Sequence, residues 1–125
     1  MSVTTGFDEA IQRGVQANAD TVAQREKVKE IFRDAADSVS KYLGKRSELR
    51  VVKCEQKRRV LILDTCEDVY DVCDFEEMSL GLFPIRLSYA KAVVTAHDET
   101  SLRAAFIEML SSPHFGRILL KIKGP

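Results

Sequence analysis

A run of acidic side chains in the second half of the chain is the feature that most clearly could do chemistry. Between residues 63 and 82 the chain has no basic residue and seven acidic ones: Asp64, Glu67, Asp68, Asp71, Asp74, Glu76 and Glu77. The run lacks the spacing of a calcium loop, because no glycine falls between Leu63 and Leu80. We interpret it either as a solvated face or as a surface that attracts a basic partner, with Tyr70 and Phe75 as aromatic anchors.

A second pattern, Glu55-x-Lys57 followed by Asp64, is similar to the metal-binding half of many nucleases. In those enzymes two acids hold Mg²⁺ and a lysine assists the attacking water. The order differs here, because Asp64 follows the E-x-K instead of preceding it, and E-x-K arises easily in a chain that is 30% charged. The sequence therefore leaves a metal-dependent nuclease or hydrolase as an alternative function.

The cysteines and histidines form no recognisable metal or catalytic motif. Cys66 and Cys73 are seven residues apart, no C-x₂-C pair occurs, and neither His97 nor His114 has a histidine four residues away. We therefore expect no cofactor, no metal site and no catalytic residue. Three cysteines, an odd number, without a secretory signal at the start predict reduced thiols and a cytoplasmic protein.

The balance of charge argues against nucleic-acid binding as a function. The chain has 19 basic and 19 acidic residues, whereas a protein surface that binds nucleic acid is strongly basic. Eight basic residues lie between Lys41 and Arg59, and we expect them to pair with the acidic run on a neighbouring strand. No apolar run approaches the ~18 residues of a membrane span, so we expect no membrane insertion.

The elements that position these residues begin with a long amphipathic segment. From Phe7 to Tyr42 apolar residues recur every three or four positions without a proline, which predicts a helix that stops at Gly44. The pattern drifts between Val22 and Val28, so one long helix and two shorter helices both fit. After Val28 the spacing is 4-3-4-3, which could form the seam of a homodimer.

The middle of the chain has the composition of strands. Residues 48–55 and 58–64 form two runs, and the apolar quartet from Val60 to Leu63 predicts a strand covered on both faces. Residues 66–78 are ambiguous: Cys66, Val69, Tyr70 and Cys73 have helical spacing, but the residue types favour a strand at 69–75. Residues 85–96 predict a strand pair or one long bent strand.

Two short helices are expected at the end of the chain. Asp98, Thr100 or Ser101 can cap the first, and Ser112 before Pro113 is a favoured start for the second. This order predicts an α+β fold: a long N-terminal helix (or two), a mostly antiparallel sheet of about four strands, and C-terminal helices that cover one face. The length of 125 residues fits a single domain, residues 1–125.

This layout and size resemble those of small bacterial chaperones of secreted effectors and of some toxin-neutralising immunity proteins. The leading hypothesis is a non-enzymatic cytoplasmic module that binds another protein. Its most concrete form is an immunity or inhibitor protein whose acidic segment, residues 64–77, occupies a basic site on a toxin or nuclease. The expected partner-binding residues are the seven carboxylates with Tyr70 and Phe75. A nuclease that uses Glu55, Lys57 and Asp64, and a homodimer through the N-terminal helix, are the alternatives.

Overall fold

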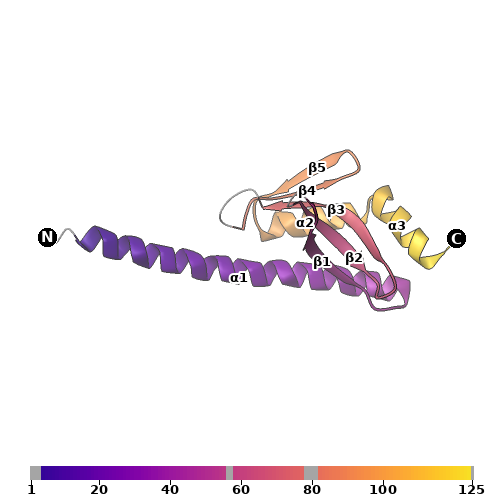
Figure 1. Ribbon diagram of the computed structural model, residues 1–125, viewed down its shortest axis with the longest axis horizontal. Coiled ribbons are helices and arrows are strands. Elements are labelled where there is room, and N and C mark those ends of the chain that lie inside the picture. Colours follow the sequence, from indigo (N-terminus) through magenta and orange to yellow (C-terminus); the bar gives the residue numbers. More distant parts are fainter. Residues whose placement is uncertain (1–3, 56–57, 78–81, 125) are drawn as a thin grey trace.

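The computed structural model of the chain describes residues 4–55, 58–77 and 82–124. The helices are α1 (Thr4–Leu43), α2 (Glu99–Leu110) and α3 (Pro113–Lys123) (Figure 1). The strands are β1 (Glu48–Lys53), β2 (Arg59–Asp64), β3 (Val69–Glu77), β4 (Ile85–Tyr89) and β5 (Ala92–Ala96). The α+β fold class is confirmed, and within the described residues the sheet has five strands, one more than expected.

The sheet is a simple antiparallel meander. Its spatial order, β1-β2-β3-β4-β5, is the order of the sequence, and each strand runs antiparallel to its neighbours. The ambiguous residues 69–77 form β3, so the strand interpretation is confirmed. Residues 85–96 form a strand pair, because Tyr89 lies opposite Ala92 and only two residues connect β4 to β5. Such short connections permit only antiparallel pairing.

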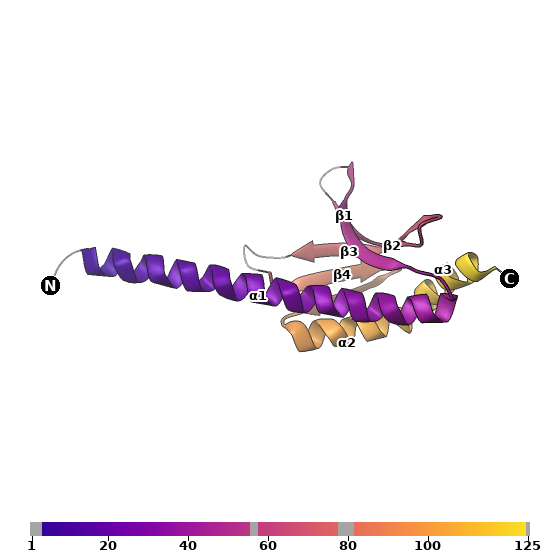
Figure 2. The ribbon, with the colours of Figure 1, turned by 90° about the horizontal axis from the view of Figure 1, so that it is seen from below.

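The helices cover one face of this sheet and enclose the core with it. Figure 2 shows α1 and α2 side by side along that face, where the ring of Phe32 in α1 stacks on that of Phe106 in α2 at 5.2 Å. Alternate residues of the strands, among them Leu61 and Leu87, point into this core and are fully buried. Val60 and Ile62 point to the other face yet are only 2% and 3% exposed, which matches the prediction of a strand covered on both faces.

The helix α1 is continuous over 40 residues, so the single-helix alternative is confirmed. It ends where Gly44 takes a left-handed conformation (φ 72°), as expected. Burial begins only at Val28, and residues 6–27, which we call the arm, are exposed except for the half-buried Thr21. The arm extends beyond the sheet (Figure 1). Within the described residues, no helix is both long and apolar enough to cross a membrane.

The two C-terminal helices begin at side-chain caps. Asp98 caps α2, and its carboxylate accepts a hydrogen bond from the Ser101 amide at 2.8 Å. Ser112 caps α3, and its hydroxyl oxygen accepts from the Phe115 amide at 3.2 Å, with Pro113 in the first helical position. Both starts satisfy amide groups that have no partner inside the helix, which is why these sequence signals were informative.

Candidate functional site

The acidic segment is largely neutralised by ion pairs. Five of its seven carboxylates pair with a base: Asp64 with Arg50 (2.8 Å), Glu67 with Lys45 (3.5 Å), Asp74 with Arg58 (3.5 Å), Glu76 with Arg86 (2.6 Å), and Glu77 with Arg25 (3.3 Å) and Arg59 (3.4 Å). Only Asp68 and Asp71 have no ion pair among the described residues. The expected pairing with the basic stretch is therefore found, and the hypothesis of seven carboxylates without a counter-ion is wrong.

Asp64 shows how closely some of these carboxylates are held. The Cys66 amide donates to its Oδ1 at 2.9 Å, and the Arg50 guanidinium donates to its Oδ2 at 2.8 Å. The amide of Cys66, with Arg50 as the second cause, lowers the pKa of Asp64 below its ordinary value of 3.8. Its Oδ1 stabilises the turn between β2 and β3, where Cys66 has a positive φ of 71°, and its Oδ2 connects β2 to Arg50 of β1. Asp64 thus has a structural role in this turn.

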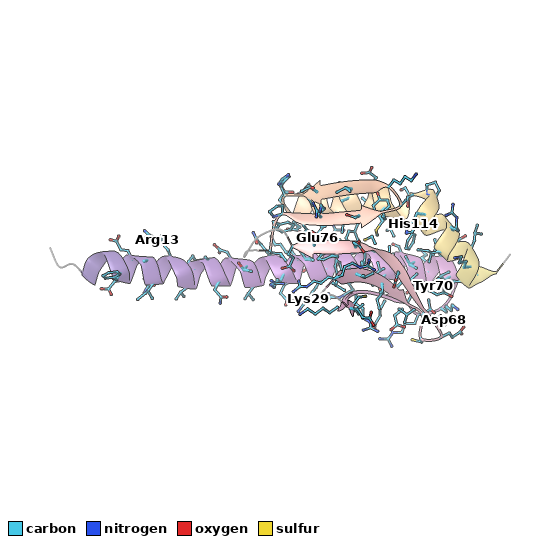
Figure 3. All side chains as sticks on the ribbon, turned by 45° about the horizontal axis from the view of Figure 1, so that its top comes forward. Arg13, Lys29, Asp68, Tyr70, Glu76 and His114 are labelled. Atoms are coloured by element: carbon cyan, nitrogen blue, oxygen red, sulfur yellow. The ribbon has the colours of Figure 1, made fainter. Side chains whose placement is uncertain are left out.

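The remaining members of the predicted site do not lie on one surface. Strand alternation places Asp71, Asp74 and Glu76 on the face away from the helices, whereas Glu77 is on the helix side. Figure 3 places Asp68 and Tyr70 at one end of the sheet and Glu76 farther toward the other. Tyr70 is half-buried and packs against the core.

Phe75 is not a surface anchor. It is 3% exposed and meets the ring of Phe32 edge-on at 5.8 Å. The reason is its position in β3: Phe75 lies opposite Leu87 on the core side of the sheet, so its ring is needed for packing between the sheet and α1. Of the two aromatic residues expected to bind a partner, only Tyr70 therefore reaches the surface at all.

The residues of the nuclease alternative are not brought together. Glu48 lies opposite Asp64 at one end of the β1–β2 hairpin, and Lys53 lies opposite Arg59 at the other. Glu55 follows Lys53, so it is at the end of the hairpin far from Asp64; Lys57 is outside the described residues. In the described part of the chain, no three side chains of His, Cys, Asp or Glu are grouped as a metal ion would require.

The thiols and imidazoles that might have formed a nucleophile have separate environments. Burial, with a smaller effect of the neighbouring Asp74 carboxylate, raises the pKa of the Cys73 thiol to about 12, so this thiol is not a nucleophile at neutral pH. His114 Nε2 lies 2.7 Å from the carbonyl oxygen of Val72, and its ring stacks on Tyr89 at 6.1 Å. His97 and Cys66 are exposed. His114 therefore has a structural role against β3.

A groove between α1 and β1 was not predicted from the sequence. It consists of two adjoining cavities of about 350 and 740 Å³, which share Lys29, Phe32 and Val51 in their lining. We call it the α1–β1 groove. The signal that could have revealed it is the spacing of Arg25, Lys29 and Arg33, because three bases four residues apart share one face of a helix.

The arm carries four large apolar side chains that are exposed. Phe7, Ile11, Val15 and Val22 are 68%, 62%, 62% and 53% exposed and form one stripe. Successive residues are about 100° apart around a helix, so this stripe is centred roughly a third of a turn from the buried face of α1. This rotation explains why the apolar pattern of the sequence drifts between Val22 and Val28.

Comparison with known proteins adds no family to this description. No protein-family model matches the chain, and neither a curated protein nor a solved structure matches it. The function must therefore be argued from the geometry of the acidic segment, the groove and the arm.

Proposed function

We propose that this protein is a non-enzymatic protein-binding module that associates with a second copy of itself through the arm, residues 6–27. The observation that carries the proposal is the stripe of Phe7, Ile11, Val15 and Val22, which are all more than half exposed. A contiguous apolar surface of this kind on a helix is typical of an interaction site.

The low stability expected for the uncovered arm supports the proposal that a partner helix binds it. Most helical stability in proteins comes from packing of one face, which the arm lacks among the described residues, and Gly6 and Gly14 each disfavour the helix by about 1 kcal/mol relative to alanine. Within the arm a side-chain bond between Gln16 and Asp20, at 3.0 Å, is one of few local supports. Burial of the stripe against another helix would stabilise the arm, because about 25 cal/mol is gained for each Å² of apolar surface removed from water.

The charges of the arm are compatible with a second copy of the chain as its binding partner. The arm has four acidic residues, Asp8, Glu9, Asp20 and Glu26, and three basic ones, Arg13, Arg25 and Lys27. Because these nearly cancel, two arms can approach without strong repulsion. A two-fold interface would bury the stripe of both copies against each other and would leave no unpaired stripe to bind a third copy, as in most homodimers.

The seam differs from the one expected after Val28. Val28, Ala35 and Val39 are buried against the sheet, so the 4-3-4-3 pattern belongs to the core and is not free for a partner. In the arm the apolar spacing is 4-4-4-3, through Ala19, which is longer than the 3.6 residues of a helical turn. Such a period favours a nearly straight or right-handed pairing of helices.

Light scattering of the whole chain tests this proposal. We expect a mass of about twice 14.1 kDa for the wild type and near 14.1 kDa for the variant I11Q/V15Q/V22Q. The matched control is V93Q/I107Q/L120Q, which removes three equally exposed apolar side chains outside the arm and should remain a dimer. A wild-type mass of one chain, or equal dissociation by both triple variants, would contradict the proposal.

The narrower expectation of an immunity or inhibitor protein stays a prediction. It now depends on Asp68 and Asp71, the two carboxylates without an ion pair among the described residues, which flank the exposed Val69. Their replacement by asparagine should slow association with a basic partner and flatten its salt dependence. An unchanged association rate would remove this candidate.

A further inference from the structure

We infer that the α1–β1 groove is a second binding site, separate from the apolar stripe of the arm, which takes an extended acidic peptide as an added strand against β1. Three observations on the described residues carry this inference: an unpaired backbone edge, an excess of basic side chains on both walls, and an apolar floor.

The backbone edge is that of β1, the outermost strand on this side of the sheet. The Cys54 amide donates to the Arg58 carbonyl at 2.6 Å, which fixes the phase of the β1–β2 ladder. Because hydrogen-bonded and non-hydrogen-bonded pairs alternate, Leu49, Val51 and Lys53 direct their amides and carbonyls away from β2. No described residue bonds these outward groups, so they form a template for another strand.

Basic side chains dominate both walls of the groove. Among its described lining residues, three are acidic (Asp37, Glu48 and Glu77) and seven are basic: Arg25, Lys29, Arg33, Arg46, Arg50, Lys53 and Arg59. Several of these bases already have an ion pair, but Arg33 on α1 and Lys53 on β1 have none with any described residue. The groove therefore has free positive charge on each side, which is complementary to carboxylates.

The floor between these walls is apolar. It is formed by Phe32 and Val28 of α1 with Val51 of β1, below the two cavities of about 350 and 740 Å³. A strand paired with β1 would run about 4.8 Å from it and direct alternate side chains toward this floor. Glutamate and valine side chains suit such a site, since both have aliphatic carbons and glutamate also reaches the bases.

A peptide fits these observations better than a nucleic acid. Single-stranded nucleic acid needs aromatic rings on which bases stack, but the rings that line the groove, Phe32 and Phe75, already contact each other, and Phe32 also stacks on Phe106. The chain also has no net positive charge. Main-chain bonds to a sheet edge with side-chain pockets beside it are instead a common mode of peptide recognition.

Fluorescence anisotropy with a labelled peptide tests the inference. The probe is an acetylated and amidated (Glu-Val)₄ peptide, compared with (Lys-Val)₄ and with (Glu-Val)₄ methylated on every backbone amide. We expect the wild type to bind only the first, and R33Q/K53Q to bind it about fivefold or more weakly, because two rim charges are lost. The matched control K91Q/K121Q removes two exposed lysines outside the groove and should bind like the wild type.

Several outcomes would overturn the inference. They are no binding of (Glu-Val)₄ by the wild type, equal binding by R33Q/K53Q, equal binding of the methylated peptide, and tighter binding of a single-stranded thymidine oligonucleotide that displaces the peptide. The variant I11Q/V15Q/V22Q should bind the peptide as the wild type does. The proposal for the groove can therefore be confirmed or refuted separately from the proposal for the arm.

Discussion

Ala90 has a backbone conformation that costs stability. It is the first of the two residues that connect β4 to β5, and its φ is 51°. A side chain in this region is crowded against the backbone, whereas glycine is not. We expect Ala90→Gly to raise the free energy of unfolding by about 0.5 kcal/mol, because the relief of strain exceeds the entropy that glycine adds to the unfolded chain.

Urea denaturation measures this change. The control is Ala104→Gly, an exposed position inside α2 where glycine should lower the free energy of unfolding by about 1 kcal/mol. If both variants were destabilised alike, the positive φ of Ala90 would not be a source of strain.

Asp64 makes the free energy of unfolding depend on pH in the acidic range. Its pKa is lowered in the folded protein, so the ionised carboxylate favours folding above its ordinary pKa of 3.8. This contribution is lost as the pH falls through the lower, folded-state pKa. The free energy of unfolding of the wild type should therefore decrease below about pH 4, and more steeply than that of Asp64→Asn. Urea titrations over this range check it, and equal slopes would show that the bonds from Cys66 and Arg50 contribute nothing.

Single residues were the least predictable part of the sequence. The β4–β5 turn lacks glycine and asparagine, so nothing in Ala90-Lys91 marked it as a tight turn. The position of Phe75 among carboxylates predicts a surface residue, but strand alternation turns it to the core and its acidic neighbours outward. Near neighbours in sequence therefore did not share a surface.

Among the features of the helices and strands, the helix caps are those in which sequence and structure agree most directly. Ser112→Ala removes the oxygen that accepts from the Phe115 amide, and we expect a loss of about 1 kcal/mol in the free energy of unfolding. Ser38→Ala, at an exposed position inside α1, is the control and should be neutral or slightly stabilising. Thermal or urea denaturation distinguishes the two. An equal effect of both would mean that the Ser112 bond does not cap α3.

β3 was ambiguous in the sequence for a physical reason. The β2–β3 register shifts between Leu61 and Ile62, which is a bulge, and two consecutive residues, Val72 and Cys73, are both buried. An extra residue interrupts the two-residue alternation, so neither a strand nor a helix pattern fits the whole run. Caps depend on a few neighbouring residues and were predicted; a bulge depends on the partner strand and could not be.

Charge at the scale of the whole molecule does not follow charge along the chain. The sequence has a basic stretch followed by an acidic one, and the β1–β2–β3 meander places them beside each other, as in the Arg50–Asp64 and Arg58–Asp74 pairs. Antiparallel neighbours thereby neutralise blocks that looked like separate surfaces. Two of the bases without an ion pair among the described residues, Arg33 and Lys53, line the α1–β1 groove from elements distant in sequence, which is why composition did not reveal it.

The lengths of the elements account for the arm. A helix of 40 residues is about 60 Å long, whereas β3, the longest described strand, has nine residues and spans about 30 Å. No sheet of this size can cover such a helix, so about half of α1 must extend beyond the core (Figure 1). The periodicity predicted the helix, but only the comparison of lengths shows that its first half extends beyond the sheet.

Amide hydrogen exchange in residues 6–22 tests the central claim most directly. If two copies pair through the arm, protection of these amides should rise steeply as the protein concentration increases from about 1 to 100 μM, since the covered helix replaces a frayed one. Amides of the core, such as those of β2, should not respond. Fast exchange in the arm at every concentration, with a protected core, would contradict the account.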